Sequence, residues 1–391
     1  MCGIIGIVNF KRDIKEQEIL ISKMMNSLEK RGPDESGIYL DHNVNLGHRR
    51  LAILDIENGK QPMTYKVHEN SYTIVYNGQI YNNNELRDVL IKNGFDFNGH
   101  SDTEVLLKAY VYFGKDVVKY LNGIFAFAIW NEKKKELFLA RDHFGIKPLY
   151  YTIRNGNFIF ASEIKALLKH PDVKLQIDNN GICELFGIGP AHSPGRTPFK
   201  DVFELEPASF IILNPDILYK KEYWKLKPEY HSDDLETTCE KVKDLIFDSV
   251  ERQMQSDVPL CSLLSGGLDS SIITAIASEK YKKEGKKLET FSVDYVDQEK
   301  NFVKNDFQPN LDMEYIKLMV NEFDTNHKQI VLDTPELYEK LEQAMIARDF
   351  PGMADVDSSY LLFFNQISKT NKVALSRRMF WWNFWWISLV F

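Results

Sequence analysis

The residue with the clearest potential for chemistry is Cys2, which stands directly after the initiator methionine. Its side chain is small enough to permit removal of that methionine, which would leave a thiol and a free α-amine on one residue. Because an α-amine has a pKa of roughly 8, it can accept the thiol proton near neutral pH and act as a general base. The alternative is a small buried residue at the start of a strand, and the position of Cys2 alone favours this alternative.

Five further segments resemble the N-terminal-nucleophile glutamine amidotransferases and follow Cys2 in that family's order. They are RGPD at residues 31–34, GHRRLAI at 47–53, YNGQIYN at 76–82, SDTE at 101–104 and RDHFGIKPLY at 141–150. The combination is specific, and it favours the nucleophile over the structural interpretation of Cys2. The resemblance implies glutaminase activity and an α+β N-terminal-nucleophile hydrolase sandwich.

The resemblance also implies a role for each matched residue. Cys2 attacks the side-chain amide carbon of glutamine, forms a thioester and releases ammonia. The tetrahedral intermediate carries an oxyanion that needs preorganised donors, and the Asn77 side chain and Gly78 backbone N–H match the family's oxyanion hole. Glycine suits this position because the backbone must approach the substrate closely.

Glutamine binding is implied for Arg50, Leu51, Ile53, Gln79 and Asp102. Arg50 matches the residue that grips the α-carboxylate, a task suited to a bidentate guanidinium. Asp102 matches the acid that pairs with the α-amine. Gln79 departs from the pattern, because some members of the family carry Glu there. An amide brings no charge, so we expect glutamine affinity to depend more heavily on Asp102.

A second motif, LSGGLDSS at residues 264–271, follows an apolar run and opens a helical pattern. Its serines and glycines expose backbone N–H groups at a helix N-terminus, where the helix dipole favours an anion. It lacks the Gly-Lys-Ser/Thr of a Walker loop and resembles the pyrophosphate loop of ATP pyrophosphatases. The resemblance assigns ATP binding to Leu264, Ser265, Gly266, Gly267, Asp269, Ser270, Val293 and Ser376. Asp269 would help hold Mg²⁺, which prefers carboxylate and phosphate oxygens.

A glutaminase followed by such an ATP domain is the arrangement of the glutamine-hydrolysing asparagine synthetases, which residues 350–359 also resemble. This resemblance implies ATP-dependent adenylation of aspartate and then attack by ammonia from the first domain. β-Lactam synthetases share both modules but usually lack the cysteine. Amidotransferases acting on sugar phosphates or phosphoribosyl diphosphate lack the loop at 265–271. The implied substrates are glutamine, aspartate and ATP, and the resemblance also allows a homodimer.

The elements that must position these residues differ between the two halves of the chain. In the first half, short apolar runs such as 72–76 and 124–130 alternate with Asn-Gly turns, which predicts antiparallel sheets with helices outside. In the second half, strand and helix patterns alternate, which predicts an incomplete α/β domain with a mostly parallel sheet and helices on both faces. We expect a glutaminase domain over 1–213, a linker over 214–234, a partial ATP-binding domain over 235–376 and a hydrophobic tail over 377–391.

The composition is that of a folded, water-soluble protein, with 44% hydrophobic and 27% charged residues. The net charge of -8 argues against binding to nucleic acids or anionic membranes. The four cysteines show no CxxC spacing, so a disulfide scaffold and a cysteine zinc site are not expected. Neither a signal peptide nor an apolar stretch of the roughly 20 residues that a membrane helix needs is apparent, so we expect a cytoplasmic protein.

Residues 377–391 depart from the family pattern. The family continues after Ser376 with a motif rich in glycine and acidic residues, whereas this chain continues with a segment that contains four Trp. A back-translation of the segment, read one nucleotide later, restores most of that motif. We therefore expect a frameshift, real or introduced by sequencing, and a chain that keeps only its glutaminase half. The alternatives are a genuine amphipathic tail, and an inactive remnant that at most binds glutamine or a partner.

Overall fold

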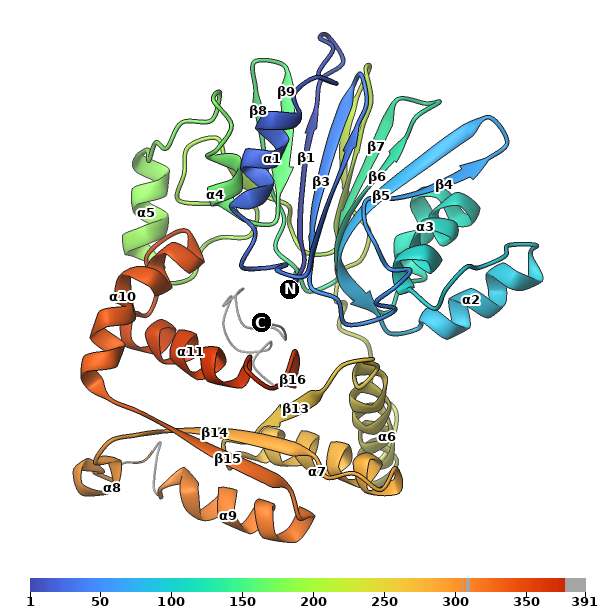
Figure 1. Cartoon of the computed structure of the whole chain (residues 1–391). Coiled ribbons are helices and arrows are strands. Elements are labelled where there is room, and N and C mark those ends of the chain that lie inside the picture. Colours follow the sequence, from blue (N-terminus) through green and yellow to red (C-terminus); the bar gives the residue numbers. More distant parts are fainter. Residues whose placement is uncertain (305, 307–309, 377–391) are drawn as a thin grey trace. The chain divides into compact units, whose positions relative to one another are not determined.

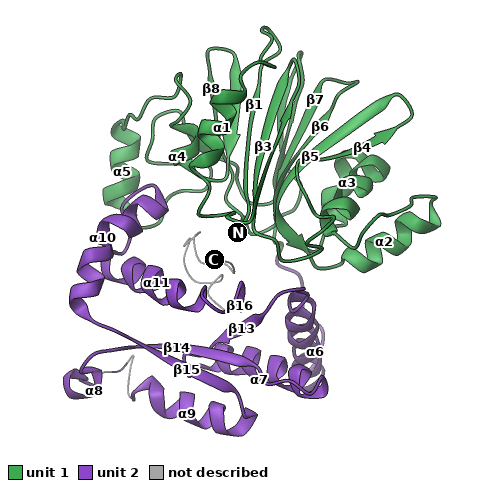
Figure 2. Cartoon of the chain, viewed as in Figure 1, with its two compact units in different colours: residues 1–227 green, residues 228–391 purple. Residues whose placement is uncertain are grey.

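The computed structural model describes all residues except 305, 307–309 and 377–391, so the predicted tail lies outside the described residues. The chain forms two compact units, Met1–Lys227 and Pro228–Phe391 (Figure 2). Figure 1 shows antiparallel strands in the first unit and a smaller sheet with helices in the second.

Unit 1 contains two six-stranded antiparallel sheets. The first has the order β10-β8-β9-β1-β3-β2 and the second the order β12-β11-β7-β6-β5-β4. The strands are β1 (Gly3–Val8), β2 (Glu35–Leu40), β3 (Val44–Arg50), β4 (Met63–Val67), β5 (Asn70–Ile80), β6 (Gly123–Asn131), β7 (Glu136–Arg141), β8 (Tyr150–Arg154), β9 (Asn157–Ala161), β10 (Phe203–Glu204), β11 (Ser209–Leu213) and β12 (Leu218–Glu222).

The two sheets of unit 1 face each other across one apolar cluster. It includes Ile4 of β1 and Leu46 of β3 from the first sheet, and Val75 of β5 and Ala128 of β6 from the second. Because successive side chains of a strand point to opposite faces, the neighbours of these residues face outward. Helices cover those outer faces, so unit 1 has four layers, as the sequence predicted.

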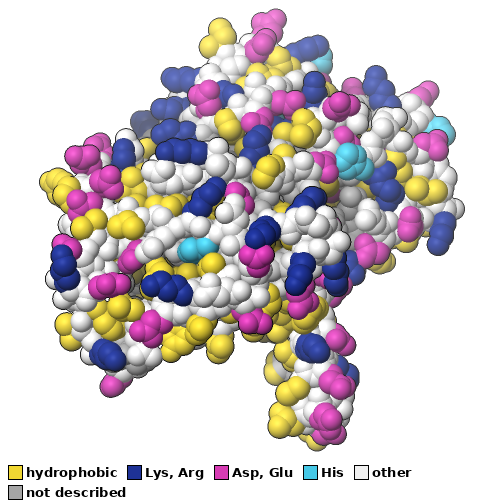
Figure 3. Space-filling model, turned by 60° about the horizontal axis from the view of Figure 1, so that its bottom comes forward, with side chains coloured by type: hydrophobic (Ala, Val, Ile, Leu, Met, Phe, Trp, Pro, Cys, Tyr) yellow, Lys and Arg dark blue, Asp and Glu magenta, His cyan; other side chains and the backbone are white. Residues whose placement is uncertain are grey.

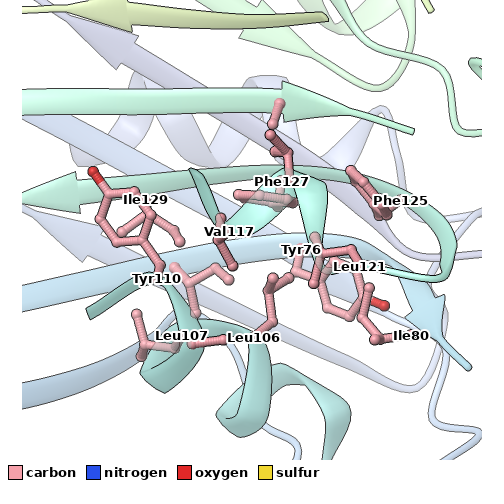
Figure 4. Close-up of a cluster of buried hydrophobic side chains, with 14 of the residues drawn as sticks. Tyr76, Ile80, Leu106, Leu107, Tyr110, Val117, Leu121, Phe125, Phe127 and Ile129 are labelled. Atoms are coloured by element: carbon pink, nitrogen blue, oxygen red, sulfur yellow. The ribbon is translucent and has the colours of Figure 1, made fainter. Parts of the chain in front are cut away.

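The helical elements of unit 1 are α1 (Glu18–Asn26), α2 (Asn83–Lys92), α3 (Asp102–Phe113), the 3-10 helix η1 (Gly114–Lys119), α4 (Ile164–Leu167) and α5 (Asn179–Gly187). Helix α1 packs on β1 and β3, and α3 packs on β5. The cluster beneath α3 joins Tyr76 and Phe127 of the sheet to Leu106 and Tyr110 of the helix (Figure 4). This packing fixes the start of α3 beside the end of β5.

Unit 2 contains a four-stranded parallel sheet with the order β15-β14-β13-β16. Its elements are α6 (Leu235–Gln253), β13 (Leu260–Leu263), α7 (Leu268–Lys283), β14 (Glu289–Tyr295), α8 (Gln298–Asn301), α9 (Asp312–Phe323), β15 (Asn326–Leu332), α10 (Thr334–Arg348), α11 (Ala354–Ile367) and β16 (Val373–Leu375). The Ser262 hydroxyl bonds that of Thr274 on α7, whereas Cys261 packs against Phe363 on α11. Adjacent residues of β13 therefore meet helices on opposite faces, as predicted.

Two details differ from the expectations. The first half of the predicted linker 214–234 contains strand β12, which pairs with β11, and unit 1 therefore extends to Lys227. The charged and exposed residues of β12 hid an edge strand from the sequence pattern. In the α/β domain predicted for the second half, helix α6 contains apolar residues at 242–250, but of these only Val250 is buried. Other hydrophobic side chains also reach the surface among charged ones (Figure 3). Among the described residues, no helix is long and apolar enough to cross a membrane.

A buried ion pair holds the end of β7 in unit 1. Arg141 is fully buried, and its Nη2 donates to Glu204 Oε1 at 2.9 Å and to the Gly145 carbonyl. Its Nε donates to the Lys147 carbonyl and its Nη1 to the Leu205 carbonyl. Burial alone would raise the pKa of Glu204, but Arg141 holds that pKa below its ordinary value. The pair therefore ties β7 to β10 and shapes the loop that contains Lys147.

We expect Arg141→Ala to destabilise unit 1 by about 3–5 kcal/mol, because it leaves Glu204 buried without its cation. Arg154→Ala is the matched control, since Arg154 forms a half-exposed pair with Asp201 and should cost less than about 1 kcal/mol. Urea unfolding followed by circular dichroism measures both. Equal unfolding midpoints for the two variants would contradict the assigned importance of the buried pair.

Candidate active sites of the two units

Cys2 lies where the start of β1 meets the end of β3. The register places Gly3 opposite Arg49, so Cys2 lies beside Arg50 and Leu51. The Cys2 sulfur is 3.4 Å from the Leu51 amide nitrogen and 3.7 Å from its carbonyl oxygen. Cys2 is a free, half-buried thiol. A thiol held at a strand end with part of its surface open can reach a substrate carbon.

Cationic side chains surround the N-terminus. Arg31 donates from Nε to the Cys2 carbonyl at 2.9 Å and from Nη1 to Glu163 at 3.0 Å. The Lys147 ammonium lies 3.2 Å from the Met1 sulfur. Burial, with Arg31 and Lys147, lowers the pKa of the chain's α-amine well below its ordinary value, and burial also lowers the pKa of Lys147 to about 8. The amine described here is that of Met1, and removal of the methionine would place the α-amine of Cys2 beside the same two cations.

The predicted oxyanion-hole residues, Asn77 and Gly78, lie near the end of β5. Val75 packs between the two sheets, so Asn77, two residues further, points toward the sheet that contains β1. The Asn77 amide nitrogen is buried and has no hydrogen-bond partner among the described residues. A Cβ on Gly78 would collide with the Ile124 carbonyl, so only glycine fits there without displacement of β6. A buried donor without a partner costs stability, so this amide is available to a ligand atom.

Arg50 is buried and largely occupied by protein groups. Its Nη1 donates to Glu35 at 2.7 Å and to the Ile56 carbonyl at 2.8 Å. Its Nη2 donates to the carbonyls of Leu54, at 3.2 Å, and Asp55, at 2.7 Å. Four of its five N–H groups are therefore used, and a bidentate grip on a carboxylate would require some of these bonds to be exchanged.

Asp102 is the first residue of α3 and is buried. Its Oδ2 accepts hydrogen bonds from the Tyr76 hydroxyl at 2.8 Å and from the Ile80 amide at 3.0 Å. Burial raises the pKa of Asp102, and the bonds from Ile80 and Tyr76 oppose that rise. Cys2 and Asp102 both lie close enough to Tyr76 to raise its pKa, which burial raises most. The structure therefore brings the predicted nucleophile and the predicted amine-binding acid around one phenol.

The remaining predicted residues of unit 1 lie on adjoining segments. Leu51 and Ile53 occupy the loop after β3, which the Asp34 carboxylate holds by accepting from the Ala52 amide at 2.9 Å. Gln79 lies on β5, directly before Ile80. Asp34 belongs to the RGPD segment, so that segment supports the loop beside Cys2.

In unit 2, the loop between β13 and α7 contains the predicted phosphate-binding residues. Leu264 continues β13 and donates to the Phe291 carbonyl at 2.8 Å. Gly266 has φ +77, a conformation that favours glycine, and Gly267 precedes the first residue of α7. The Ser270 hydroxyl lies 3.1 Å from the Ser265 hydroxyl and donates to the Gly267 carbonyl at 3.0 Å. The turn therefore presents backbone N–H groups at a helix N-terminus.

The other predicted ATP residues lie beside this loop, at the carboxyl ends of the strands. Ser262 pairs with Leu375, so Ser376 leaves β16 beside the end of β13. Val293 lies near the end of β14, the other neighbour of β13. The chain order reverses between β13 and β16, and ligands of open parallel sheets bind at the carboxyl ends of such strands. Asp269, in the first turn of α7, is half-buried there. No cluster of three or more metal-binding side chains occurs among the described residues.

The sequence did not single out several residues that organise the site of unit 1. Asp55 accepts from the amides of His100 and Ser101 at 2.7 and 3.0 Å, and its carbonyl accepts from Arg50. Glu35 pairs with Arg50, and Glu163 with Arg31. Nothing in the spacing of these residues indicates their partners, which are distant in sequence. The presence of Asp55 and Glu35 next to matched segments was the only available signal.

Two family models match the chain. A glutamine amidotransferase domain covers residues 1–224, and an asparagine synthase model covers residues 241–376. The chain is 46% identical over 377 residues to asparagine synthetase [glutamine-hydrolyzing] 3 of Bacillus subtilis, which covers 96% of this chain and 61% of the relative. It is 36% identical over 375 residues to putative asparagine synthetase [glutamine-hydrolyzing] 2 of Methanocaldococcus jannaschii, which covers 90% and 68%.

A third relative, asparagine synthetase [glutamine-hydrolyzing] 1 of Bacillus subtilis, is 41% identical over 303 residues, which covers 76% of this chain and 46% of the relative. The chain thus spans about half to two thirds of the length of these curated relatives.

The buried His48 gives a pH dependence of stability. Its Nε2 donates to the Tyr76 carbonyl at 3.0 Å, and burial lowers its pKa to about 3. The unfolded chain takes up this proton near pH 6.5, whereas the folded chain does not until about pH 3. Stability is therefore lost as the pH falls below 6.5, at up to about 1.4 kcal/mol per pH unit.

We expect His48→Gln, which keeps a donor for the Tyr76 carbonyl, to remove this contribution. Its free energy of unfolding should fall less steeply between pH 6.5 and 4 than that of the unmodified chain. His68→Asn alters an exposed histidine in the β4–β5 turn and should leave the slope unchanged. Parallel slopes for His48→Gln and the unmodified chain would contradict the assignment.

Proposed function

Because the chain belongs to the family of glutamine-hydrolysing asparagine synthetases, we propose that it contains the glutaminase and ATP-binding parts of an asparagine-forming ligase. Unit 1 releases ammonia from glutamine, and unit 2 binds the ATP that activates aspartate. The observation that carries the glutaminase half is the buried Asn77 amide, which has no hydrogen-bond partner within the described part of the chain and lies on the strand face toward Cys2.

The glutaminase step uses the first residue after methionine removal. The freed α-amine of Cys2 accepts the thiol proton, and the sulfur forms a bond to the side-chain amide carbon of glutamine. The oxyanion that forms is stabilised by Asn77 and by the Gly78 N–H. The C–N bond then breaks, ammonia leaves with the proton returned by the amine, and water hydrolyses the thioester to glutamate.

Charges of both signs hold the amino acid part of glutamine. Asp102 accepts from the α-ammonium, and Arg50 donates to the α-carboxylate from its remaining N–H and from groups that exchange their present carbonyl partners. Leu51 and Ile53 line the loop beside the thiol, and Gln79 offers an uncharged acceptor near Asp102.

A free Cys2 thiol requires a reducing compartment, which supports a cytoplasmic location.

The loop of unit 2 would serve the ligase step, for which we expect this chain to contain only part of the site. The N–H groups of residues 265–270 bind the pyrophosphate part of ATP, and Leu264, Val293 and Ser376 lie at the sheet edge that receives the nucleoside. Asp269 contributes a carboxylate to Mg²⁺, whose chemistry is to neutralise phosphate charge. The aspartate side-chain carboxylate attacks the α-phosphorus and releases pyrophosphate. Ammonia then displaces AMP and gives asparagine.

One prediction of the proposed function concerns the nucleophile. Cys2→Ala should abolish ammonia release from glutamine and leave the fold intact, because only a small half-buried thiol is lost. A chain that retains Met1 should be equally inactive, since its Cys2 nitrogen is an amide. An ammonia assay measures activity, and mass spectrometry identifies the N-terminus. Cys183→Ala is the control, because Cys183 is an exposed thiol of α5. Equal turnover by Cys2→Ala and the unmodified chain would refute the glutaminase proposal.

The second prediction concerns the metal. Asp269→Asn should remove the gain in ATP affinity that Mg²⁺ provides, at least about tenfold, because an amide cannot replace a carboxylate for this hard cation. Calorimetric titration of the full chain with ATP, with and without Mg²⁺, measures the gain. Asp248→Asn, on the exposed face of α6, should leave it unchanged. If Asp269→Asn keeps the full effect of Mg²⁺, the role given to Asp269 is incorrect.

A further inference from the structure

We propose that Tyr76 is a positioning residue for glutamine binding: its phenol hydroxyl orients the Asp102 carboxylate and keeps it as the anion that accepts from the substrate ammonium. This inference rests on the proposed function, in which Asp102 binds that ammonium. It assigns to Tyr76 a role that acts through Asp102 and not on the reacting atoms.

The geometry of the pair fixes the carboxylate. The Tyr76 hydroxyl and the Ile80 amide both donate to Asp102 Oδ2, at 2.8 and 3.0 Å. Rotation of the carboxylate about its Cβ–Cγ bond would break both of these bonds, so the two donors oppose it. Hydrogen bonds to charged groups are the stronger class, so the phenol contributes more here than it would to a neutral acceptor.

Tyr76 is itself held at both its backbone and its ring. Its amide donates to Gln61 at 2.6 Å, and its carbonyl accepts from His48 at 3.0 Å. Its ring is buried in the cluster beneath α3, with Leu106 and Phe125 (Figure 4). The packing of β5 against α3 therefore fixes the direction in which the phenol hydroxyl points.

The electrostatics require such a donor. Burial raises the pKa of Asp102 and favours the neutral acid, which could not bind an ammonium as an anion does, and the bonds from Ile80 and Tyr76 oppose this. Burial and the Asp102 charge raise the pKa of Tyr76 itself, so the phenol keeps its proton. Cys2 and Tyr81 also lie near Tyr76, Tyr81 lies near Asp102 and Asp142, and the titratable His48 bonds the Tyr76 carbonyl. Gln79 adds no negative charge, so the ionisation of Asp102 matters the more.

The test measures glutamine binding against pH in a Cys2→Ala background, where glutamine is bound without being cleaved. Binding requires ionised Asp102, so affinity falls as the pH decreases through the pKa of that carboxyl. Tyr76→Phe should raise this pKa, move the acid limb to higher pH and weaken binding on the order of tenfold. Tyr110→Phe removes another buried phenol hydroxyl of the same cluster and should leave the acid limb unchanged.

A second probe uses the opposite direction of change. A fluorinated tyrosine at position 76 keeps the ring and the hydroxyl but is a stronger donor, so it should move the acid limb to lower pH. This measurement also decides the question if Tyr76→Phe does not fold. An acid limb that follows neither substitution would overturn the proposal.

Carbon-13 NMR titration of the Asp102 carboxyl in the full chain separates this inference from the proposed function. If glutamine does not bind to the Cys2→Ala chain at all, the proposed function fails, and the placement of Tyr76 in glutamine binding fails with it. If glutamine binds but Tyr76→Phe leaves the Asp102 titration unchanged, the proposed function stands and the role of Tyr76 is refuted. A higher carboxyl pKa together with a shifted acid limb supports both.

Discussion

The buried residue Asp55 joins two segments on which the site of unit 1 depends. One is the end of β3 with Arg50, and the other is the start of α3 with Asp102. The Asp55 carboxylate accepts from the amides of His100 and Ser101, and Ser101 caps the helix that begins with Asp102. The Asp55 carbonyl accepts from Arg50, at the end of β3. Burial opposes the charge of Asp55, but hydrogen bonds from Asn58 and His100 keep its pKa below the ordinary value. The cation and the anion proposed to hold glutamine are thus positioned through one residue.

A buried charge needs several hydrogen-bond partners, and this requirement also explains where the matched segments lie. Asp142, whose pKa burial raises, accepts from the amides of Phe125, Ile146 and Lys147. Those bonds shape the loop that places Lys147 beside the N-terminus. Segments far apart in the chain therefore share one polar region at the ends of apolar strands. Disruption of one segment is expected to disturb the others, because neighbouring charged side chains form hydrogen bonds to the same stretches of backbone.

Much of the fold could be predicted from local patterns. The apolar runs at 72–76 and 124–130 lie in strands β5 and β6, and strands alternate with helices in the second half as predicted. Strand β12 escaped prediction because all of its residues are exposed, so burial left no alternation to detect. Which helix covers which sheet face followed only from packing, as Ser262 and Cys261 illustrate.

The matched site residues came from segment resemblance, and the structure adds what resemblance could not supply. The partners of Arg50 lie in β2 and in the loop at 54–56, and the partner of Asp102 lies 26 residues earlier in the chain. Such pairs depend on strand register and on the docking of α3, which no local pattern encodes. The sequence therefore suggested which side chains matter, whereas the number of N–H groups that Arg50 has left for a ligand required coordinates.

The charged ligands proposed for the two units call for different physical means of binding. An amino acid carries opposite charges a few bonds apart, so a site for it needs a cation and an anion at fixed separation, and unit 1 places both in buried positions. A pyrophosphate carries one sign of charge spread over many oxygens, and backbone N–H groups at a helix N-terminus match it without buried cations. This explains why the loop at 265–270 contains serines and glycines in place of lysine or arginine.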